Sequence, residues 1–351
     1  MKAKTALKII NLRSDTQTLP TEEMLRAITR AELGDDTYGE DPTVKRFESL
    51  AAKKLGKEAA LLVISGHMGN LCALMAHATP GDEVLLDPES HIFYYEQGSM
   101  ASVAGLMPMP IPAVKGMLDP DDLQAAIRRR NLHYPVPRLL CLENTHNRCG
   151  GRAMSLQLHN ELCRVAHDGG LAVHLDGARI FNAAIRHGVS AASYAERADS
   201  VMFCLSKGLS CPLGSVLVGS SEFIARADSA RKRIGGGMRQ AGIIAACGVV
   251  ALESMIDRLA EDHANAQLLA RGLNEIEGLQ IDLDSVETNM VYVDHSRLGM
   301  TTDEVLSRLK AIGVLASGRP PRQIRFVTHR HYGKAKIQEA LHRIRTSLGA
   351  K

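Results

Sequence analysis

The sequence has 351 residues, of which 45% are apolar and 23% are charged, and 42 Lys and Arg against 39 Asp and Glu give a net charge of +3. This length exceeds the size at which one hydrophobic core usually stops growing, so we expect a large domain and a smaller one. The nearly balanced charge provides no basic surface of the kind that binds nucleic acid, which excludes that class of protein.

Short apolar runs alternate with longer amphipathic segments through the first 255 residues. We predict strands at 59–65, 83–86, 106–111, 138–143, 171–175, 200–205 and 215–218. A helix is expected to start near His67, and Asp119 followed by Pro120 opens another. The proline-rich segment 107–112 is typical of an edge strand. The alternation predicts an α/β domain with a mostly parallel sheet that helices cover on both faces.

The pattern changes near Ala246, where we predict a long helix that continues through Arg258 towards Leu273. Beyond it we expect strands at 279–283, 289–293 and 323–327, and helices at 302–309 and 334–348. These elements form a compact α+β unit. We therefore predict a large domain over residues 1–255, including the N-terminal segment, and a small C-terminal domain over residues 256–351.

The seven cysteines are odd in number and show no CxxC spacing, so we predict neither a disulfide framework nor a metal site. Most of them lie inside apolar runs, where a cysteine acts as a small hydrophobic residue. Lys8 interrupts the only apolar stretch near the N-terminus, so no signal peptide is expected, and no apolar run is long enough to cross a bilayer. These features favour a cytoplasmic protein without membrane contact.

Two predicted strands end in residues that suit one cofactor. Asp176 follows the run 171–175, and Lys207 follows the run 200–205. An acid at the carboxyl end of a parallel strand can bind a pyridinium nitrogen, and a desolvated lysine can form a Schiff base. Asp176 is equally suited to cap the next helix, and Lys207 to extend into solvent. The combination favours pyridoxal phosphate (PLP).

Three further positions carry chemistry. Segment 65–70 joins a predicted strand to a helix, where backbone N–H groups can bind a phosphate, although a plain tight turn explains it as well. Arg179 is suited to bind a substrate carboxylate or to pair with Asp176. His91 follows a strand and can stack on a pyridine ring or act as a general base. His146 is expected to be structural from composition alone.

Six segments, in the same order, resemble the threonine aldolase family of fold-type I PLP enzymes along nearly the whole chain. They are 11–16, 34–42, 142–146, 175–179, 205–208 and 235–240. The resemblance implies a PLP-dependent carbon–carbon lyase that cleaves L-threonine, L-allo-threonine or related β-hydroxy-α-amino acids to glycine and an aldehyde. It also implies a homotetramer with active sites at dimer interfaces. The alternative is a β-eliminating PLP lyase of the same fold.

The resemblance assigns roles to individual residues. The catalytic set is Lys207 as the covalent anchor of PLP, Asp176 at the pyridine nitrogen, and His91 and His133 as candidate bases. The cofactor is held by Gly66, His67, His91, Asp176, Arg179, Lys207 and Arg239, with His91 stacked on the ring and Arg239 at a cofactor phosphate. The substrate is held by Ser14, His133, Arg179 and Arg325, with His133 near the hydroxyl group.

The sequence departs from the family pattern in two places. The family usually has threonine where this chain has His67, so the hydroxyl contact to phosphate is not predicted here, while backbone N–H groups can still serve. After Glu96 the chain reads Gln97-Gly98-Ser99, where the family often has a second glycine.

Two rival classes are disfavoured. A PLP-binding protein without catalysis would not need lysine, aspartate and both substrate arginines together, and no DNA-binding segment is attached. A nicotinamide-dependent dehydrogenase could use the same sheet, but the first strand–turn–helix lacks the GxGxxG motif.

Overall fold

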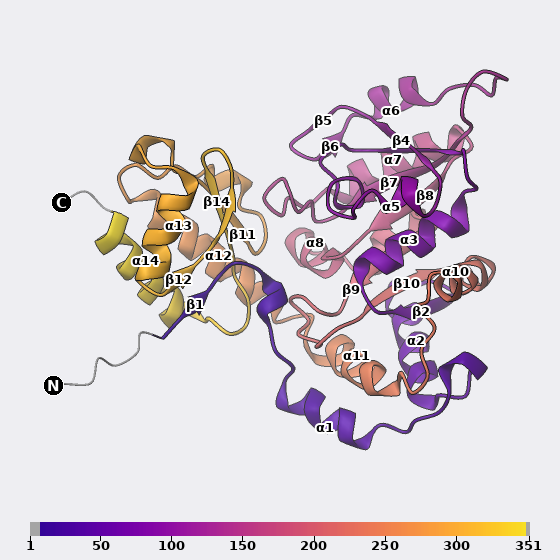
Figure 1. Cartoon of the computed structure of the whole chain (residues 1–351), viewed down its shortest axis with the longest axis horizontal. Helices are drawn as coiled ribbons and strands as arrows, with labels where there is room; N and C mark the ends of the chain where they lie inside the picture. The colour runs from indigo at the N-terminus through magenta and orange to yellow at the C-terminus, as the bar shows by residue number, and fades with distance from the viewer. Residues whose placement is uncertain (1–7, 349–351) are drawn as a thin grey trace. The chain divides into compact units, whose positions relative to one another are not determined.

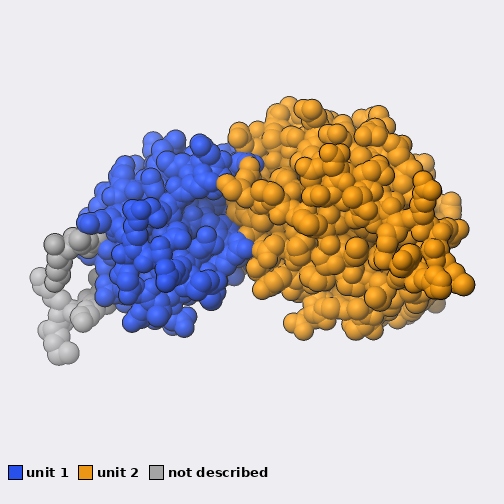
Figure 2. Space-filling view, turned by 90° about the horizontal axis from the view of Figure 1, so that it is seen from above, with its two compact units in different colours: residues 1–18, 258–351 blue, residues 19–257 orange. Residues whose placement is uncertain are grey.

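The computed structural model describes residues 8–348, which form two compact units (Figure 2). The large unit comprises residues 19–257, and the small unit comprises residues 258–348 together with residues 8–18. Across residues 8–348, no helix has both the length and the apolar character needed to cross a membrane.

The large unit is built on one seven-stranded sheet (Figure 1). Its order is β2 (Ala59–Val63), β10 (Ser215–Gly219), β9 (Ser200–Cys204), β8 (Ala172–Asp176), β7 (Pro137–Glu143), β3 (Glu83–Leu86) and β4 (Met107–Pro110). Only β10 is antiparallel to its neighbours, and the other pairs are parallel, which confirms the predicted α/β fold with a mostly parallel sheet. The proline-rich strand β4 lies at the edge, where a missing N–H donor costs least.

Alternate residues of the strands face opposite sides of the sheet, and each side is covered by helices. Leu61 and Val63 of β2 and Met202 of β9 pack against α3 (Gly66–His77) and α10 (Ser221–Arg233). The residues between them face the other side, where α2 (Pro42–Leu55) contacts β2 and β10. Every residue of β9 is buried, as expected for a strand covered on both faces.

Helix α3 approaches β9 so closely that its first turn requires glycine. A Cβ atom on Gly66 would lie 2.9 Å from Cys204 Sγ, and one on Gly69 would lie 2.7 Å from Met202 Cγ. Both distances are shorter than side chains tolerate. The glycines therefore bring the amino end of α3 next to the carboxyl end of β9.

The remaining elements of the large unit connect these layers. They are α1 (Glu22–Arg30), α4 (His91–Tyr94), α5 (Ser99–Ser102), β5 (Ala113–Val114), β6 (Met117–Leu118), α6 (Pro120–Ala126), α7 (Leu156–Asp168), α8 (Ile180–His187), α9 (Ala191–Arg197) and α11 (Gly242–Ser254). Helix α6 begins as predicted, because the Asp119 side chain accepts the N–H of Asp121 and Pro120 occupies the first turn.

The small unit is an α+β sandwich of its own. Strands β11 (Met290–Asp294), β14 (Gln323–Val327) and β13 (Ser317–Arg319) form an antiparallel sheet, and α12 (Leu259–Asn274), α13 (Thr302–Ala311) and α14 (Lys334–Leu348) complete the unit. Strand β1 (Ile10–Asn11) pairs in parallel with β12 (Val314–Leu315). The structure thus groups residues 8–18 with the small unit, whereas the predicted division places them in the large domain. The reason is this strand pairing, supported by the burial of Ile10 and Leu12 in the small unit's core.

Two predicted elements of the C-terminal part are wrong. The long helix from 246 to 273 is two helices, α11 and α12, separated at residues 255–258 because each helix packs into a different unit. The strand predicted at 279–283 is reduced to a single bridge between Gln280 and Asp294. There the Ile281 N–H donates to the Asn274 side chain instead of a strand partner, so the ladder cannot extend.

Candidate active site

The site is built at the carboxyl ends of parallel strands in the large unit, where ligands of open α/β sheets gather. Asp176 is the last residue of β8 and is buried, and Lys207 lies three residues beyond β9 in a half-buried turn. The two strand ends are joined because the Gly177 N–H donates to the Met202 carbonyl at 2.8 Å. The structure therefore brings the predicted acid and lysine to the same edge of the sheet.

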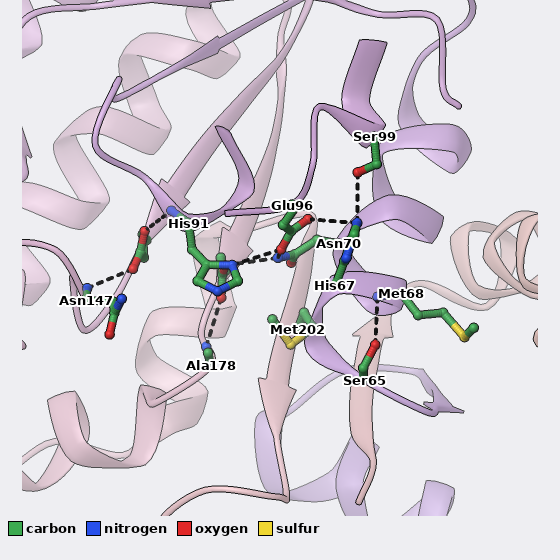
Figure 3. A network of polar contacts seen from close by, with 12 residues as sticks. Ser65, His67, Met68, Asn70, His91, Glu96, Ser99, Asn147, Ala178 and Met202 are labelled. Carbon is green, nitrogen blue, oxygen red and sulfur yellow. Dashed lines mark hydrogen bonds and ion pairs between the residues drawn. The ribbon is translucent and has the colours of Figure 1, made fainter. Parts of the chain in front are cut away.

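A buried amide orients the Asp176 carboxylate (Figure 3). Asn70 of α3 donates one N–H to Asp176 Oδ2 and the other to Glu96 Oε1, each at 2.9 Å. The second oxygen of Asp176 accepts the backbone N–H of Ala178 at 3.1 Å. Both carboxylate oxygens are thus held in place by donors, which fixes their direction for a further ligand.

The orientation of Asn70 is itself set by a chain of neutral groups. Asn70 Oδ1 accepts from His174 Nε2 at 3.0 Å, and His174 Nδ1 faces Ser200 Oγ at 2.8 Å. Ser200 in turn accepts from His77 Nε2 at 2.7 Å. Burial lowers the pKa of His174 to about 4 and that of His77 to about 3, so both rings are neutral at pH 7. Since each neutral ring has one N–H, this bonding gives a single consistent direction to every donor in the chain.

His91 begins α4 and points towards the same acids. Its Nδ1 lies 3.0 Å from Glu96 Oε1, and its backbone N–H donates to Glu143 Oε2 at 2.6 Å. Burial lowers the pKa of His91, but the hydrogen bond to Glu96 and the nearby charges of Asp176 and Glu143 outweigh it and raise the pKa overall. Because a carboxylate only accepts, Nδ1 carries the proton in the neutral ring and leaves Nε2 as a base.

A second histidine at this edge forms a buried ion pair. His146 Nε2 lies 2.6 Å from Asp87 Oδ2 and 3.9 Å from Glu143 Oε2. Burial alone would lower its pKa, yet Glu143 and the Asp87 hydrogen bond raise it to about 11. The imidazolium of His146 supports the loops that carry His91, a structural role consistent with the sequence.

The amino end of α3 provides the predicted phosphate-binding position. The Ser65 side chain caps the helix by accepting the N–H of Met68 at 3.2 Å, which leaves the N–H groups of Gly66 and His67 in the same turn for an anion. Gly66 allows the close approach of α3 to β9. His67 Nε2 lies 2.9 Å from Ser99 Oγ, so the two departures from the family pattern are in contact (Figure 3).

The two predicted arginines of the large unit differ in exposure. Arg179 is buried at the start of α8, directly after the Asp176 turn. Arg239 lies in the glycine-rich segment before α11, and its exposed guanidinium pairs with Asp35 at 3.0 Å. Arg179 is thus part of the strand-end cluster, whereas Arg239 is on the surface of the chain.

The predicted substrate residues Ser14 and Arg325 both belong to the small unit. Arg325 is on β14, and its guanidinium donates to the carbonyl of Arg13 at 3.2 Å. Ser14 is the next residue along the chain and caps a short 3-10 helix at Asp15–Gln17. The small unit therefore brings together two residues that are 311 positions apart in the sequence.

His133 is not brought to this site within one chain. It is exposed in the loop before β7, at the amino end of that strand. Asp176 and His91 lie at the opposite, carboxyl edge, and seven strand residues span about 20 Å. The prediction that His133 approaches the substrate rests on the family resemblance, and the position of His133 within one chain does not account for it.

Three residues of the cluster are absent from the predicted site set. Glu96, Asn70 and Glu143 are all buried polar residues. The sequence offers weak hints: Asn70 follows His67 by one helical turn, and Glu143 ends a predicted strand, as Asp176 does, within segment 142–146. Glu96 is recognisable only once the α4–α5 turn is folded.

The residues present fit PLP. An oriented acid, a lysine in the adjacent turn, a flat ring in His91 and a free helix amino end match the pyridine nitrogen, aldehyde, ring face and phosphate of that cofactor. His91, Glu96 and Asp176 also present ligand atoms within 4.8 Å of one another, a spacing open to a cation. However, the hydrogen bonds from Asn70 and His91 already direct these oxygens, so we assign the cluster to the organic cofactor.

Comparisons with known proteins agree with this geometry. The family model described as beta-eliminating lyase matches residues 11–296. Low-specificity L-threonine aldolase 1 of Arabidopsis thaliana is 42% identical over 349 residues, covering 95% of this chain and 97% of that protein. The structure of a threonine aldolase from Leishmania major aligns with a TM-score of 0.83 at 18% identity, covering 97% of this chain and 99% of that one. The structure of a serine palmitoyltransferase from Sphingomonas wittichii aligns with a TM-score of 0.76 at 17% identity, covering 97% of this chain and 87% of that one. At these identities the two structures show the fold alone.

Proposed function

The chain belongs to the threonine aldolases of the β-eliminating lyase family, and from that premise we propose that it cleaves L-threonine, L-allo-threonine or a related β-hydroxy-α-amino acid. The products are glycine and an aldehyde. The observation that carries the proposal is the oriented His91–Glu96–Asn70–Asp176 cluster beside the Lys207 turn. This cluster combines a base with an acid that binds a pyridinium, and both are needed to break a carbon–carbon bond next to an amine.

PLP, when bound, supplies an electron sink through its pyridine ring. Lys207, in the turn after β9, would hold the cofactor covalently through its side-chain amine. Asp176 accepts a hydrogen bond from the ring nitrogen and keeps that nitrogen protonated, a role for which Asn70 and the Ala178 N–H hold its oxygens. His67 and Gly66, at the amino end of α3, bind the phosphate.

His91 acts on the substrate hydroxyl. Because Glu96 holds the proton of His91 on Nδ1, the Nε2 atom accepts the proton of the β-hydroxyl group as the Cα–Cβ bond breaks. The hydroxyl carbon leaves as the aldehyde, and Cα then takes up a proton to give glycine. Removing the hydroxyl proton drives the cleavage because the electrons of that O–H bond form the new carbonyl.

The substrate carboxylate is held by arginines. A guanidinium fork suits a carboxylate, so we assign this role to Arg179 of the large unit. The family resemblance assigns it also to Arg325 and Ser14 of the small unit. Fixing this group aligns the Cα–Cβ bond for cleavage, and this alignment distinguishes the aldolase reaction from elimination of the hydroxyl group.

We further propose a homotetramer in the cytoplasm, with active sites at dimer interfaces. The placement of His133 and Arg239 supports this assembly. His133 lies at the amino end of β7, away from the cluster of its own chain, and Arg239 is exposed, so both are accessible to another copy of the chain. The absence of disulfides among the seven cysteines, all within residues 8–348, supports a reducing compartment. Light scattering during size-exclusion chromatography measures the subunit number.

The central test uses the purified protein with PLP and, separately, L-threonine and L-allo-threonine. We expect equal amounts of glycine and acetaldehyde to form. Lys207→Ala should lose both the visible absorption of the bound cofactor and turnover. Lys54→Ala, which removes an exposed lysine on α2, serves as the matched control and should retain both.

The product distinguishes the proposal from the β-eliminating alternative of the same family. Formation of an oxo acid and ammonia in place of glycine and aldehyde would favour elimination. Aldehyde release by Lys207→Ala at the wild-type rate would contradict the assignment of the lysine.

A further inference from the structure

Glu96 is a buried carboxylate that faces two histidines from different elements. Its side chain is 1% exposed and its Oε1 accepts from His91 Nδ1 at 3.0 Å and from Asn70 Nδ2 at 2.9 Å. Its Oε2 lies 3.9 Å from His67 Nε2 and has no hydrogen-bond partner among residues 8–348. A buried carboxylate oxygen without a donor is costly, so its position next to a titratable ring requires an explanation.

The two histidines reach Glu96 from different elements, α3 and α4. His91 is 34% exposed and His67 is 40% exposed, so each ring has one side on Glu96 and another open to a ligand. His67 is in the first turn of α3, at the phosphate end, whereas His91 is beside the Asp176 carboxylate. Figure 3 shows both rings directed towards Glu96 from different segments of the chain.

The hydrogen bonds determine what each ring can do. In His91, the Nδ1 proton is committed to Glu96, which leaves Nε2 as an acceptor. In His67, Nε2 faces the Ser99 hydroxyl and the Glu96 carboxylate, which leaves Nδ1 for an external group. A phosphate only accepts, so His67 contacts it through an Nδ1–H that donates outward, and a proton on Nε2 as well would point inward to Ser99 and Glu96. The charge of Glu96 balances the imidazolium that results.

We propose that Glu96 is a positioning residue shared by two histidines: it holds His91 as a base with the proton on Nδ1, and with Ser99 it holds His67 as a cationic ligand of the cofactor phosphate. This inference rests on the proposed PLP-dependent function. The Glu96 carboxylate thus fixes both the position of the proton on the catalytic base His91 and the orientation of the phosphate ligand His67. His67 thereby supplies a charged contact where the family usually has a hydroxyl group.

Other ionisable groups near this cluster are consistent with the proposal. Asp176 from β8 and Glu143 from β7 face His91, and Tyr95 lies against the His91 ring at a centroid distance of 5.4 Å. Burial and the charge of Asp176 raise the pKa of Glu96, while the His91 hydrogen bond lowers it. A neighbouring cation therefore stabilises the charged form of Glu96. A protonated His67 that binds the cofactor phosphate is such a cation.

The test compares the affinity of the apoprotein for PLP with its affinity for pyridoxal, which lacks the phosphate. We expect His67→Gln to weaken PLP binding about tenfold, the loss of one charge-assisted contact, with pyridoxal binding unchanged. Glu96→Gln should weaken PLP binding to a similar extent. The double variant should bind PLP no more weakly than His67→Gln alone, because Glu96 acts on the phosphate through His67.

A second readout addresses His91. Since Glu96 helps to raise the pKa of His91, Glu96→Gln should move the acid limb of kcat/KM to lower pH by about one unit, whereas His67→Gln should not move it. Ser99→Ala should weaken PLP binding less than His67→Gln does. Glu161→Gln on α7 and Ser102→Ala on α5 are exposed controls and should leave every value at the wild-type level.

The proposal is overturned if His67→Gln weakens PLP and pyridoxal binding equally, or if Glu96→Gln leaves both the PLP affinity and the acid limb unchanged. Should Glu96→Gln not fold, the half-exposed His67→Gln and the Ser99→Ala variants still decide the phosphate contact. Because these affinities are measured without turnover, they separate this inference from the aldolase assignment, which fails only on the identity of the products.

Discussion

His174 and His146 lie at similar depth in the same unit, with 0% and 1% of their surface exposed. At pH 7, however, the His174 ring is neutral and the His146 ring is positively charged. His174 faces Asn70 and Ser200, which are neutral, and burial lowers its pKa to about 4. His146 faces Asp87 and Glu143, and its pKa rises to about 11 despite burial. The partner's charge, not the depth of burial, decides the protonation of a buried histidine.

Because of this difference, one histidine at this sheet edge orients the cofactor-binding acid and the other stabilises the surrounding loops. The neutral His174 orients Asn70 and, through it, Asp176, without adding a charge beside the pyridine nitrogen. The charged His146 holds together the loops that follow β3 and β7. His91 is intermediate, because it has one carboxylate partner and one open side, and such a residue is suited to proton transfer near neutral pH.

The largest effect is expected when the charged pair is broken. Asp87→Leu leaves the buried imidazolium of His146 without its hydrogen-bond partner and should lower the free energy of unfolding by about 3–5 kcal/mol. Urea denaturation of the apoprotein at pH 7 measures the change. In the double variant Asp87→Leu/His146→Leu the unpaired charge is gone, so part of the loss should be recovered. A single variant no less stable than the double one would falsify the ion-pair assignment.

The neutral histidine predicts a pH effect of intermediate size. The folded-state pKa of His174 is about 4, below the ordinary value of 6.5, so its contribution to stability is complete above about pH 6.5 and is lost as the pH falls towards 4. His174→Gln should flatten this acid limb of the unfolding free energy by on the order of 3 kcal/mol. Urea titrations from pH 7 to pH 4 test it, with the exposed His342→Gln as the control. An acid limb identical to that of the wild type would contradict the neutral assignment.

The smallest effect is expected at the surface. The pair between Arg239 and Asp35 is exposed to solvent, so Arg239→Ala should change the free energy of unfolding by less than about 1 kcal/mol. The same variant should weaken PLP binding if Arg239 reaches a cofactor phosphate in the assembled enzyme. If Arg239→Ala lowered the free energy of unfolding as much as Asp87→Leu does, the exposed Arg239–Asp35 pair would be as important for stability as the buried His146–Asp87 pair. That result would contradict the comparison.

The fold was largely predictable because strands and helices follow local periodicity. Strand β3, strand β14 and helix α14 have the predicted bounds, and Asp176 and Lys207 lie at strand ends, as the apolar runs before them indicate. The errors arise where a neighbour in space decides. Residues 8–18 join the small unit through pairing with a strand 304 positions away, and residues 279–283 lose their ladder to a side chain. Local pattern carries no information about either partner.

The sequence by itself determined most strands and helices of the large unit, the placement of an acid and a lysine at strand ends, and which family the motifs resemble. Tertiary structure decided that His133 is at the other edge, that Glu96 joins His67 to His91, and that His174 and His146 differ in charge. The physical reason is that the pKa and orientation of a buried group depend on its contacts. Those contacts come from residues far away in the chain, such as the 104 positions between Asn70 and His174.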